Sequence, residues 1–195
     1  MSSPLKPLLE EIHDLEKLVA DKIHQTADHW PFDIQDGRIV FDPAVRTQHR
    51  EQMQRLMQYL RESSLMAIAT APVIYSLLLP IAMLDLFVSL FQIICFRVYS
   101  IPRVSRSEYV VIDRHHLAYL NWIEKVNCVY CGYANGVLAH AREIASRTEQ
   151  YWCPIKHASR VKGCHSRQCL FCEYGDAEGF RREFDELRQR FSDIE

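Results

Sequence analysis

The chain has 195 residues, of which 48% are apolar and 25% are charged, and its formal net charge is −2. This length allows one domain, or two small ones around a membrane element. Because the charge is close to neutral and no lysine or arginine run stands out, nucleic acid is not an expected partner.

The N-terminal region, residues 1–63, predicts amphipathic helices and no signal peptide. Apolar residues recur at steps of three and four through 5–25, interrupted by charges that a signal peptide core would lack. The following PFDIQDGRIVFDP predicts a loop or short hairpin that turns at Asp36-Gly37. Asp42-Pro43 predicts the start of a second helix, because proline suits the first helical position.

The strongest feature of the sequence is an apolar stretch of 32 residues, Leu65–Phe96. It contains no lysine, arginine or glutamate, and its only formal charge is Asp85. Apolar runs above about 18 residues predict membrane segments, so we expect residues 64–99 to enter the lipid bilayer. The alternative is a buried core helix, which so small a protein could hardly cover.

Two membrane geometries fit this stretch. A single helix of 32 residues, kinked at Pro72 and Pro80, is about 48 Å long against about 30 Å of hydrocarbon. A membrane-inserted helical hairpin that turns between Pro80 and Asp85 has arms of about 24 Å, which suits a shallow insertion. In the hairpin, Asp85 caps the second arm; its functional alternative is an ion or proton site.

Arginines flank the apolar stretch on both sides, which favours the hairpin. The positive-inside rule places both flanks in the cytoplasm, and a hairpin keeps its two ends on one side. The arginines concerned are Arg46, Arg50, Arg55 and Arg61 before the stretch and Arg97, Arg103, Arg106 and Arg114 after it.

Residues 100–195 predict a small helical domain rich in cysteine and histidine. Periodic patterns indicate helices over 113–126, 135–152 and 177–192. The expected fold class is therefore all-α: an N-terminal helical region, a membrane hairpin or span over 64–99, and the Cys/His-rich helical domain.

Six of the seven cysteines lie in 128–172, and their spacing predicts a metal site. The odd count and the lack of a secretion signal argue against a disulfide framework. Two residues between Cys128 and Cys131 let both thiolates reach one ion, and Gly132 would allow the sharp fold of a knuckle. Cys153 and His157 would complete a tetrahedral Zn²⁺ site.

A second cysteine cluster leaves other arrangements open. Cys164, Cys169 and Cys172, beside His165, could form their own site or hold an iron–sulfur cluster, although the spacing differs from ferredoxin runs. A four-sulfur alternative combines Cys128, Cys131, Cys169 and Cys172. Reduced thiols in a helical core are a further alternative. Redox-active CxxC chemistry is less expected, because no βαβ setting is visible.

Carboxylates and imidazoles form another candidate set, which would make the protein an enzyme. Asp113, His116 and Glu124 can share one helix face, and His140 and Glu143 another. Facing helices with Glu and His build di-iron sites, so this set predicts a membrane-bound, iron-dependent oxidoreductase acting on a lipid or quinone. The alternative is an ordinary capping or ion-pair role, since the His-x-x-Glu order is reversed and has no second copy.

The runs EKVNCVYCGYANG and RTEQYWCPIKHA, with the later YGDAEGF, resemble a family of uncharacterised bacterial membrane-associated proteins. The resemblance covers roughly half of the chain. It implies a bacterial inner-membrane setting and a signature region that includes Cys128, Cys131, Cys153 and His157. It implies no reaction.

The leading functional prediction is a membrane-attached, metal-binding protein, with zinc as a structural ion, that serves as a scaffold or adaptor. Its expected partners are the lipid bilayer and a membrane protein, with its soluble parts in the cytoplasm. The iron-dependent oxidoreductase is the alternative. The sequence contains no P-loop, GxGxxG, GxSxG or HExxH motif, so it indicates no familiar enzyme class.

Overall fold

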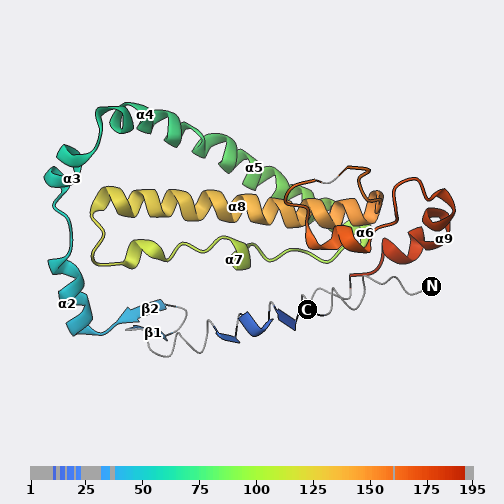
Figure 1. Cartoon of the computed structure of the whole chain (residues 1–195), viewed down its shortest axis with the longest axis horizontal. Helices are drawn as coiled ribbons and strands as arrows, with labels where there is room; N and C mark the ends of the chain where they lie inside the picture. The colour runs from blue at the N-terminus through green and yellow to red at the C-terminus, as the bar shows by residue number, and fades with distance from the viewer. Residues whose placement is uncertain are drawn as a thin grey trace. The chain divides into compact units, whose positions relative to one another are not determined.

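A computed structural model of the chain describes residues 11, 14–15, 17–19, 21–22, 32–35, 38–159 and 161–191. This part of the chain is mostly helical (Figure 1), as the all-α prediction requires. It divides into two compact units, one of Met1–Met53 with His116–Tyr119 and the other of Gln54–His115 with Leu120–Glu195.

The first unit contains the predicted hairpin and the predicted second helix. Strands β1 (Phe32–Gln35) and β2 (Arg38–Phe41) pair antiparallel, while Asp36-Gly37 lies outside the described residues. Helix α2 (Pro43–Glu51) begins where the Asp42 carboxylate accepts a hydrogen bond from the Ala44 N–H at 2.7 Å. The described residues between 11 and 22 are helical and exposed, and the rest of the helix predicted over 5–25 lies outside the described residues.

The second unit is built on two long helical runs. The first, here called the apolar helix, extends from Leu65 to Tyr99. It consists of α4 (Leu65–Ser76), α5 (Leu78–Phe91), the π-helical turn η1 (Gln92–Phe96) and α6 (Arg97–Tyr99). The second is α8 (Trp122–Trp152), which runs parallel to α5 and beside it (Figure 1).

Short helices complete this unit. Residues 100–115, here called the returning segment, run back along α8 (Figure 1). These helices are α3 (Leu56–Glu62), α7 (Arg106–Tyr109), η3 (Ser166–Leu170) and α9 (Ala177–Leu187), together with Arg114 and His115 of η2 (Arg114–His116).

The apolar stretch forms one helical run and not the favoured hairpin. Between Pro80 and Asp85, where the hairpin would turn, α5 continues without a break. Asp85 therefore lies inside a helix and caps nothing. The hydrogen-bond pattern does change at Leu77, because Pro80 has no N–H to donate to the Ser76 carbonyl.

Helix α8 replaces the two helices predicted over 113–126 and 135–152. It begins later than expected, at a capping box in which Asn121 accepts from the Glu124 N–H at 3.1 Å and Glu124 accepts from the Asn121 N–H at 2.8 Å. It then continues through Cys128 and Gly132, where the sequence predicted a knuckle.

Gly132 and Gly136 let the returning segment approach this helix closely. A Cβ at Gly136 would lie 2.7 Å from both the Tyr109 carbonyl oxygen and the Val110 Cα, and one at Gly132 would lie 3.1 Å from the Val111 carbonyl oxygen. Residues four apart lie on one face of a helix. The two glycines thus form a flat face on which the backbone of the returning segment packs.

A small hydrophobic core joins α8 to the end of the apolar helix. Phe96, Ile101, Val104 and Ile144 are buried together, and Tyr99 and Tyr151 are among the rings that pack around them. The turn after α6 that builds this core is made by Ser100, in the left-handed conformation, and by Ile101, whose N–H donates to the Phe96 carbonyl at 2.9 Å.

Candidate functional site

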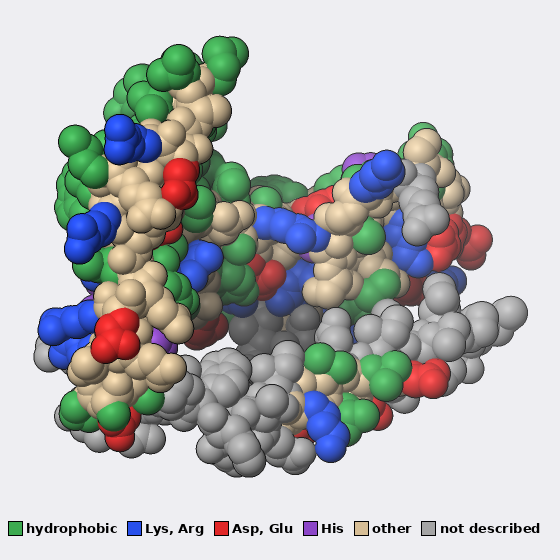
Figure 2. Space-filling view, turned by 60° about the vertical axis from the view of Figure 1, so that its left-hand side comes forward, with side chains coloured by type: hydrophobic (Ala, Val, Ile, Leu, Met, Phe, Trp, Pro, Cys, Tyr) green, Lys and Arg blue, Asp and Glu red, His purple; other side chains and the backbone are tan. Residues whose placement is uncertain are grey.

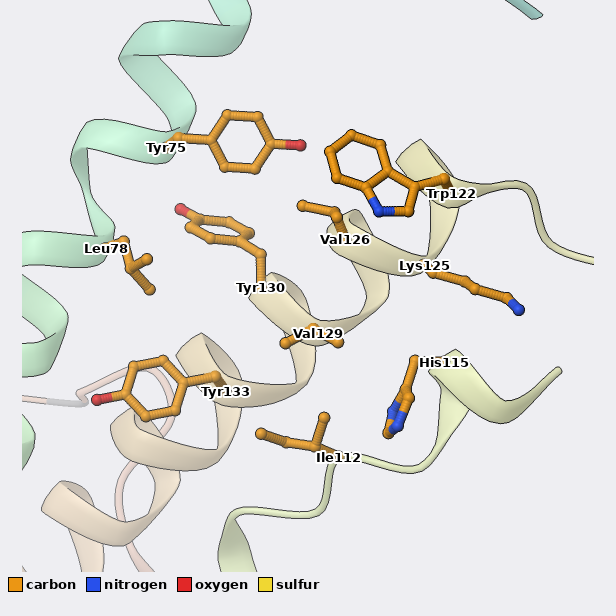
Figure 3. A pocket seen from close by; sticks show the side chains of 10 residues that line it. All are labelled: Tyr75, Leu78, Ile112, His115, Trp122, Lys125, Val126, Val129, Tyr130 and Tyr133. Carbon is orange, nitrogen blue, oxygen red and sulfur yellow. The ribbon is translucent and has the colours of Figure 1, made fainter. Parts of the chain in front are cut away.

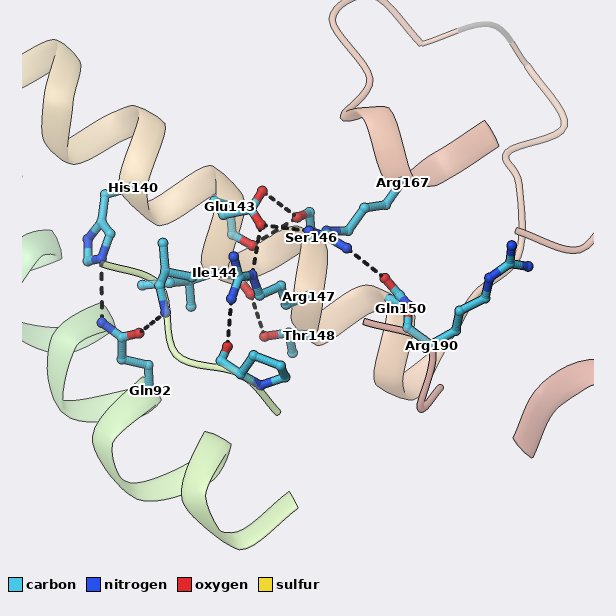
Figure 4. Close-up of polar contacts among 12 residues, drawn as sticks. Gln92, His140, Glu143, Ile144, Ser146, Arg147, Thr148, Gln150, Arg167 and Arg190 are labelled. Atoms are coloured by element: carbon cyan, nitrogen blue, oxygen red, sulfur yellow. Dashed lines mark hydrogen bonds and ion pairs between the residues drawn. The ribbon is translucent and has the colours of Figure 1, made fainter. Parts of the chain in front are cut away.

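A line of polar contacts runs along α8, and its first part surrounds His140 (Figure 4). Gln92, on the π-helical turn, accepts from the Val104 N–H at 3.0 Å, and its amide nitrogen lies 3.4 Å from His140 Nε2. Because the Gln92 amide oxygen accepts from the Val104 N–H, the Gln92 amide nitrogen faces His140, where it donates and His140 Nε2 accepts. The imidazole, which is fully buried, then carries its proton on Nδ1.

The second part of this line neutralises the only charge of the apolar stretch. The Asp85 carboxylate accepts from Arg106 Nη2 at 2.8 Å, from Arg106 Nε at 3.1 Å and from the Tyr133 hydroxyl at 3.0 Å. Asp85 is thus an ion-pair partner that ties α5 to α7 and α8, rather than a helix cap.

The third part is a buried ion cluster around Glu143 (Figure 4). Its carboxylate accepts from Arg147 Nε at 2.7 Å and from Arg167 Nη2 at 3.0 Å, and both arginine side chains are only 6% exposed. Burial acts to raise the pKa of Glu143, but the hydrogen bonds and charges of the two arginines outweigh it and hold that pKa below its usual value. The cluster binds η3 to α8.

Two further contacts extend this cluster to neighbouring segments. Arg147 Nη1 donates to the Pro102 carbonyl at 2.7 Å, which fixes the start of the returning segment. Gln150 accepts from Arg167 Nη1 at 3.3 Å and donates to the Leu187 carbonyl at 3.0 Å, which holds the end of α9. The polar contacts of this region therefore hold neighbouring segments of the chain together.

We expect the stability of the protein to depend on pH through His140. Burial lowers the pKa of His140 from its ordinary 6.5, so below about pH 6.5 the unfolded chain takes up a proton that the folded chain does not. Stability is therefore full above that pH and falls as the pH drops towards the folded pKa. The total loss is about 1.4 kcal/mol for each pH unit that separates the pKa of the folded chain from that of the unfolded chain.

Chemical unfolding between pH 7.5 and 5 measures this effect. His140→Gln should remove this part of the pH dependence, whereas His157→Gln, at a histidine closer to the surface, should leave it in place. An unchanged pH dependence in His140→Gln would contradict the assignment.

The structure does not bring the predicted zinc ligands together. Cys128 and Cys131 lie in the first half of α8, and Cys153 follows its last residue, so Cys128 and Cys153 are about 37 Å apart along the helix axis. Among the described residues, no group of three or more His, Cys, Asp or Glu side chains could hold a metal ion. These residues do not fit the four-ligand site with His157, and zinc stays a prediction from the sequence.

The second cysteine cluster lies at the other end of α8 from Cys128. The Cys172 N–H donates to the Pro154 carbonyl at 2.9 Å, which places Cys172 beside the C-terminus of that helix. The four-sulfur set with Cys128 and Cys131 is therefore not formed either. Burial raises the pKa of the Cys169 and Cys172 thiols, which favours their neutral form. Cys164 is exposed.

The carboxylate and imidazole set is also dispersed. Glu124 and His140 stand on the same helix, about 24 Å apart, and Glu124 is part of the capping box. Glu143 is held by its two arginines. Asp113 lies in the returning segment, and His116 belongs to the first unit. Glu124 and Glu143 thus have the capping and ion-pair roles that the sequence left as the alternative.

Sequence reasoning missed the partners that make the polar line. In the sequence, Gln92 is one polar residue in an apolar stretch, and Arg106 is one of several flanking charges. The unpaired Asp85 was the available signal, because a carboxylate in an apolar helix requires a cation nearby. Arg167 had no comparable signal, since it reaches Glu143 from a segment 24 residues later.

Comparison of the chain with protein-family models, with curated proteins and with solved structures found no match. The resemblance of the cysteine signature to bacterial membrane-associated proteins therefore stays a prediction.

Proposed function

We propose that the protein is a monotopic membrane scaffold, in which the apolar helix lies in the plane of one leaflet and holds the rest of the second unit at the membrane surface. The observation that carries this proposal is the difference between the two sides of the apolar helix. One side of the apolar helix exposes large apolar residues, and from α5 onwards the other side packs against polar, partly irregular chain.

The exposed side supports contact with lipid. In the most apolar 18-residue part of this helix only 11% is buried, whereas the core helix of a soluble protein is mostly buried. Hydrophobic side chains gather over the arm that carries α3 and the start of α4 (Figure 2). An exposed apolar surface of this extent marks an interaction site. Side chains at least 60% exposed include Leu65, Met66, Val73, Leu79, Phe87 and Val98.

The covered side favours a helix that lies in the plane of the membrane rather than one that crosses it. The returning segment runs alongside, with Val104 at Gln92 and Arg106 at Asp85, and much of it is neither helix nor strand. Irregular backbone exposed to hydrocarbon would leave N–H and C=O groups unpaired. A crossing helix would carry this segment into the bilayer. An in-plane helix buries its apolar side by about 5–10 Å and leaves the segment in water.

The arginine flanks agree with this arrangement. A helix in the plane of the membrane keeps both flanks on one face, and the positive-inside rule favours the cytoplasmic one. On this proposal the polar half of α8 and the cysteine-rich residues 153–172 stand on the cytoplasmic side of a bacterial inner membrane, where a partner protein can reach them.

Membrane attachment should be lost when charge is placed on the exposed side. We expect Leu79→Glu with Phe87→Glu to shift the chain from the membrane to the soluble fraction, because each carboxylate costs up to about 3 kcal/mol in hydrocarbon. Val161 is also exposed but lies outside the apolar helix, so Val161→Glu should stay in the membrane. Flotation of full-length protein with vesicles measures both variants. Equal flotation of all proteins would contradict the proposal.

The positions of the chain ends distinguish an in-plane helix from a crossing one. Tags at the N-terminus and the C-terminus should both be accessible to protease in inside-out vesicles and protected in right-side-out vesicles. Tags on opposite faces would show a crossing helix and overturn the monotopic arrangement.

A further inference from the structure

Two hollows adjoin the apolar helix, and the second offers positive charge to a ligand. The first, of about 440 Å³, lies between α8 and the junction of α4 and α5. Its lining is almost wholly apolar, and Lys125 directs its amine away from it (Figure 3). Because a few well-placed polar groups are what give a pocket its specificity, this cavity selects no class of ligand.

The second hollow is a groove of about 490 Å³ at the end of the apolar helix, where the chain turns into the returning segment. Arg97 of α6 and Arg103 of the returning segment both line it, and both side chains are exposed. Within the described part of the chain, neither guanidinium group has an ion pair or a hydrogen bond, and the groove has no carboxylate in its lining. The groove therefore presents two unpaired positive charges.

The turn after α6 brings these two arginines to one groove. Ser100 adopts the left-handed conformation, and the Ile101 N–H donates to the Phe96 carbonyl at 2.9 Å, so the helix ends and the chain reverses here. On the far side of the turn, the Pro102 carbonyl accepts from Arg147 Nη1 at 2.7 Å. The backbone that carries both arginines is thus fixed before any ligand binds.

Aromatic side chains at the same end of the helix indicate the depth of lipid headgroups. The Tyr99 ring centroid lies 5.2 Å from that of Tyr151 and 5.1 Å from that of Trp152, and Trp152 is 53% exposed. Tyrosine and tryptophan gather at membrane–water interfaces. Two exposed apolar side chains, Ile94 and Val98, precede the groove along the helix. An anion with an apolar chain therefore suits this end of the helix.

We propose that this groove binds one anionic phospholipid, with its phosphate at Arg97 and Arg103 and an acyl chain along Ile93, which also lines the groove. A guanidinium group matches phosphate because it presents parallel N–H donors to two oxygens. This inference deepens the proposed function and rests on it, since a helix in the plane of the membrane brings its end to the headgroups. The bound lipid would attach the start of the returning segment to the membrane.

Native mass spectrometry of the full-length, detergent-solubilised protein tests the proposal. The probes are dioleoyl phosphatidylglycerol, which is anionic, and dioleoyl phosphatidylcholine, which has the same chains and no net charge. We expect one phosphatidylglycerol to bind saturably, with about three- to tenfold preference over phosphatidylcholine, as two exposed ion pairs would give. Equal binding of the two lipids would overturn the proposal.

Two double variants with the same change of charge test whether the groove is responsible. Arg97→Gln with Arg103→Gln should abolish the preference for phosphatidylglycerol. Arg55→Gln with Arg61→Gln, at exposed arginines before the apolar helix, should retain it. Circular dichroism should show the same helix content in both. A preference that persists in the first variant, or that falls equally in the two, would refute the groove as the site.

Soluble phosphate is the other source of the same anionic group, and it is tested separately. Glycerol phosphate, at the concentration of lipid used, should not displace phosphatidylglycerol, because it lacks the acyl chains. Ile93→Gln should weaken both lipids by a similar factor and keep the preference between them. Displacement by glycerol phosphate, or wild-type lipid binding in Ile93→Gln, would overturn the assignment to a lipid.

The two proposals fail separately. A protein that floats with vesicles but shows no lipid preference retains the membrane proposal and loses this one. A protein that does not float but binds phosphatidylglycerol through Arg97 and Arg103 retains the groove site and loses the membrane scaffold.

Discussion

Glu143→Leu is expected to lower the free energy of unfolding by about 3–5 kcal/mol, the usual cost of leaving a buried charge without its partner. The size follows from the surroundings of this carboxylate. It is the counter-ion of both Arg147 and Arg167, whose side chains are almost fully buried. Without it, two guanidinium groups stay out of water with carbonyl and amide oxygens among their remaining acceptors.

Urea unfolding at neutral pH measures this loss against two controls. Glu143→Gln keeps a hydrogen-bond acceptor and should fall between the wild type and Glu143→Leu. Glu186 is exposed on α9, and Glu186→Leu should change stability by less than about 0.5 kcal/mol. If Glu143→Leu and Glu186→Leu unfold alike, the cluster does not stabilise the fold.

Acid should reproduce part of the effect in the wild type. Since the pKa of Glu143 is lowered in the folded chain, its stabilisation is full above the ordinary value of 4.5 and is lost as the pH falls through the folded pKa. Glu143→Gln should lose this part of the acid sensitivity.

Local signals predicted the starts of α2 and α9, although they missed the capping box of Asn121 and Glu124 that begins α8. Asp42 before Pro43 and Asp176 before Ala177 both accept a hydrogen bond from the first turn of a helix, and α2 and α9 begin there. A side-chain cap acts within three residues, so a short stretch of sequence contains what determines where such a helix begins. The β1–β2 hairpin follows from equally local residues.

Features that depend on a distant partner were not predictable in this way. The CxxC pattern of Cys128 and Cys131 suits a knuckle in a loop, but in α8 the same spacing only places two thiols near one face. The returning segment decides between the knuckle and the helix. Its backbone packs on Gly132 and Gly136, and this contact stabilises the helix at those residues. The hairpin prediction was wrong for a similar reason, because α8 and the returning segment pack along one side of a continuous helical run.

The two glycines are therefore the positions where the fold is most sensitive to added volume. Gly136→Leu is expected to destabilise the protein by about 1–3 kcal/mol or more through overpacking. Any side chain at Gly136 meets backbone atoms of Tyr109 and Val110 at 2.7 Å, and backbone cannot rotate away as a side chain can. The returning segment must then move as a whole, which also pulls Arg106 away from Asp85.

Gly132→Ala is the graded control for this prediction. Alanine in a helix interior is normally favoured over glycine by about 0.5–1 kcal/mol, and at Gly132 the nearest atom, the Val111 carbonyl oxygen, is 3.1 Å from the added Cβ. The order of stability should be wild type close to Gly132→Ala, then Gly136→Ala, then Gly136→Leu, measured by urea unfolding. A Gly136→Ala variant more stable than the wild type would mean that α8 and the returning segment do not pack this closely. The single helix through Cys128 and Gly132 would then lose its main support.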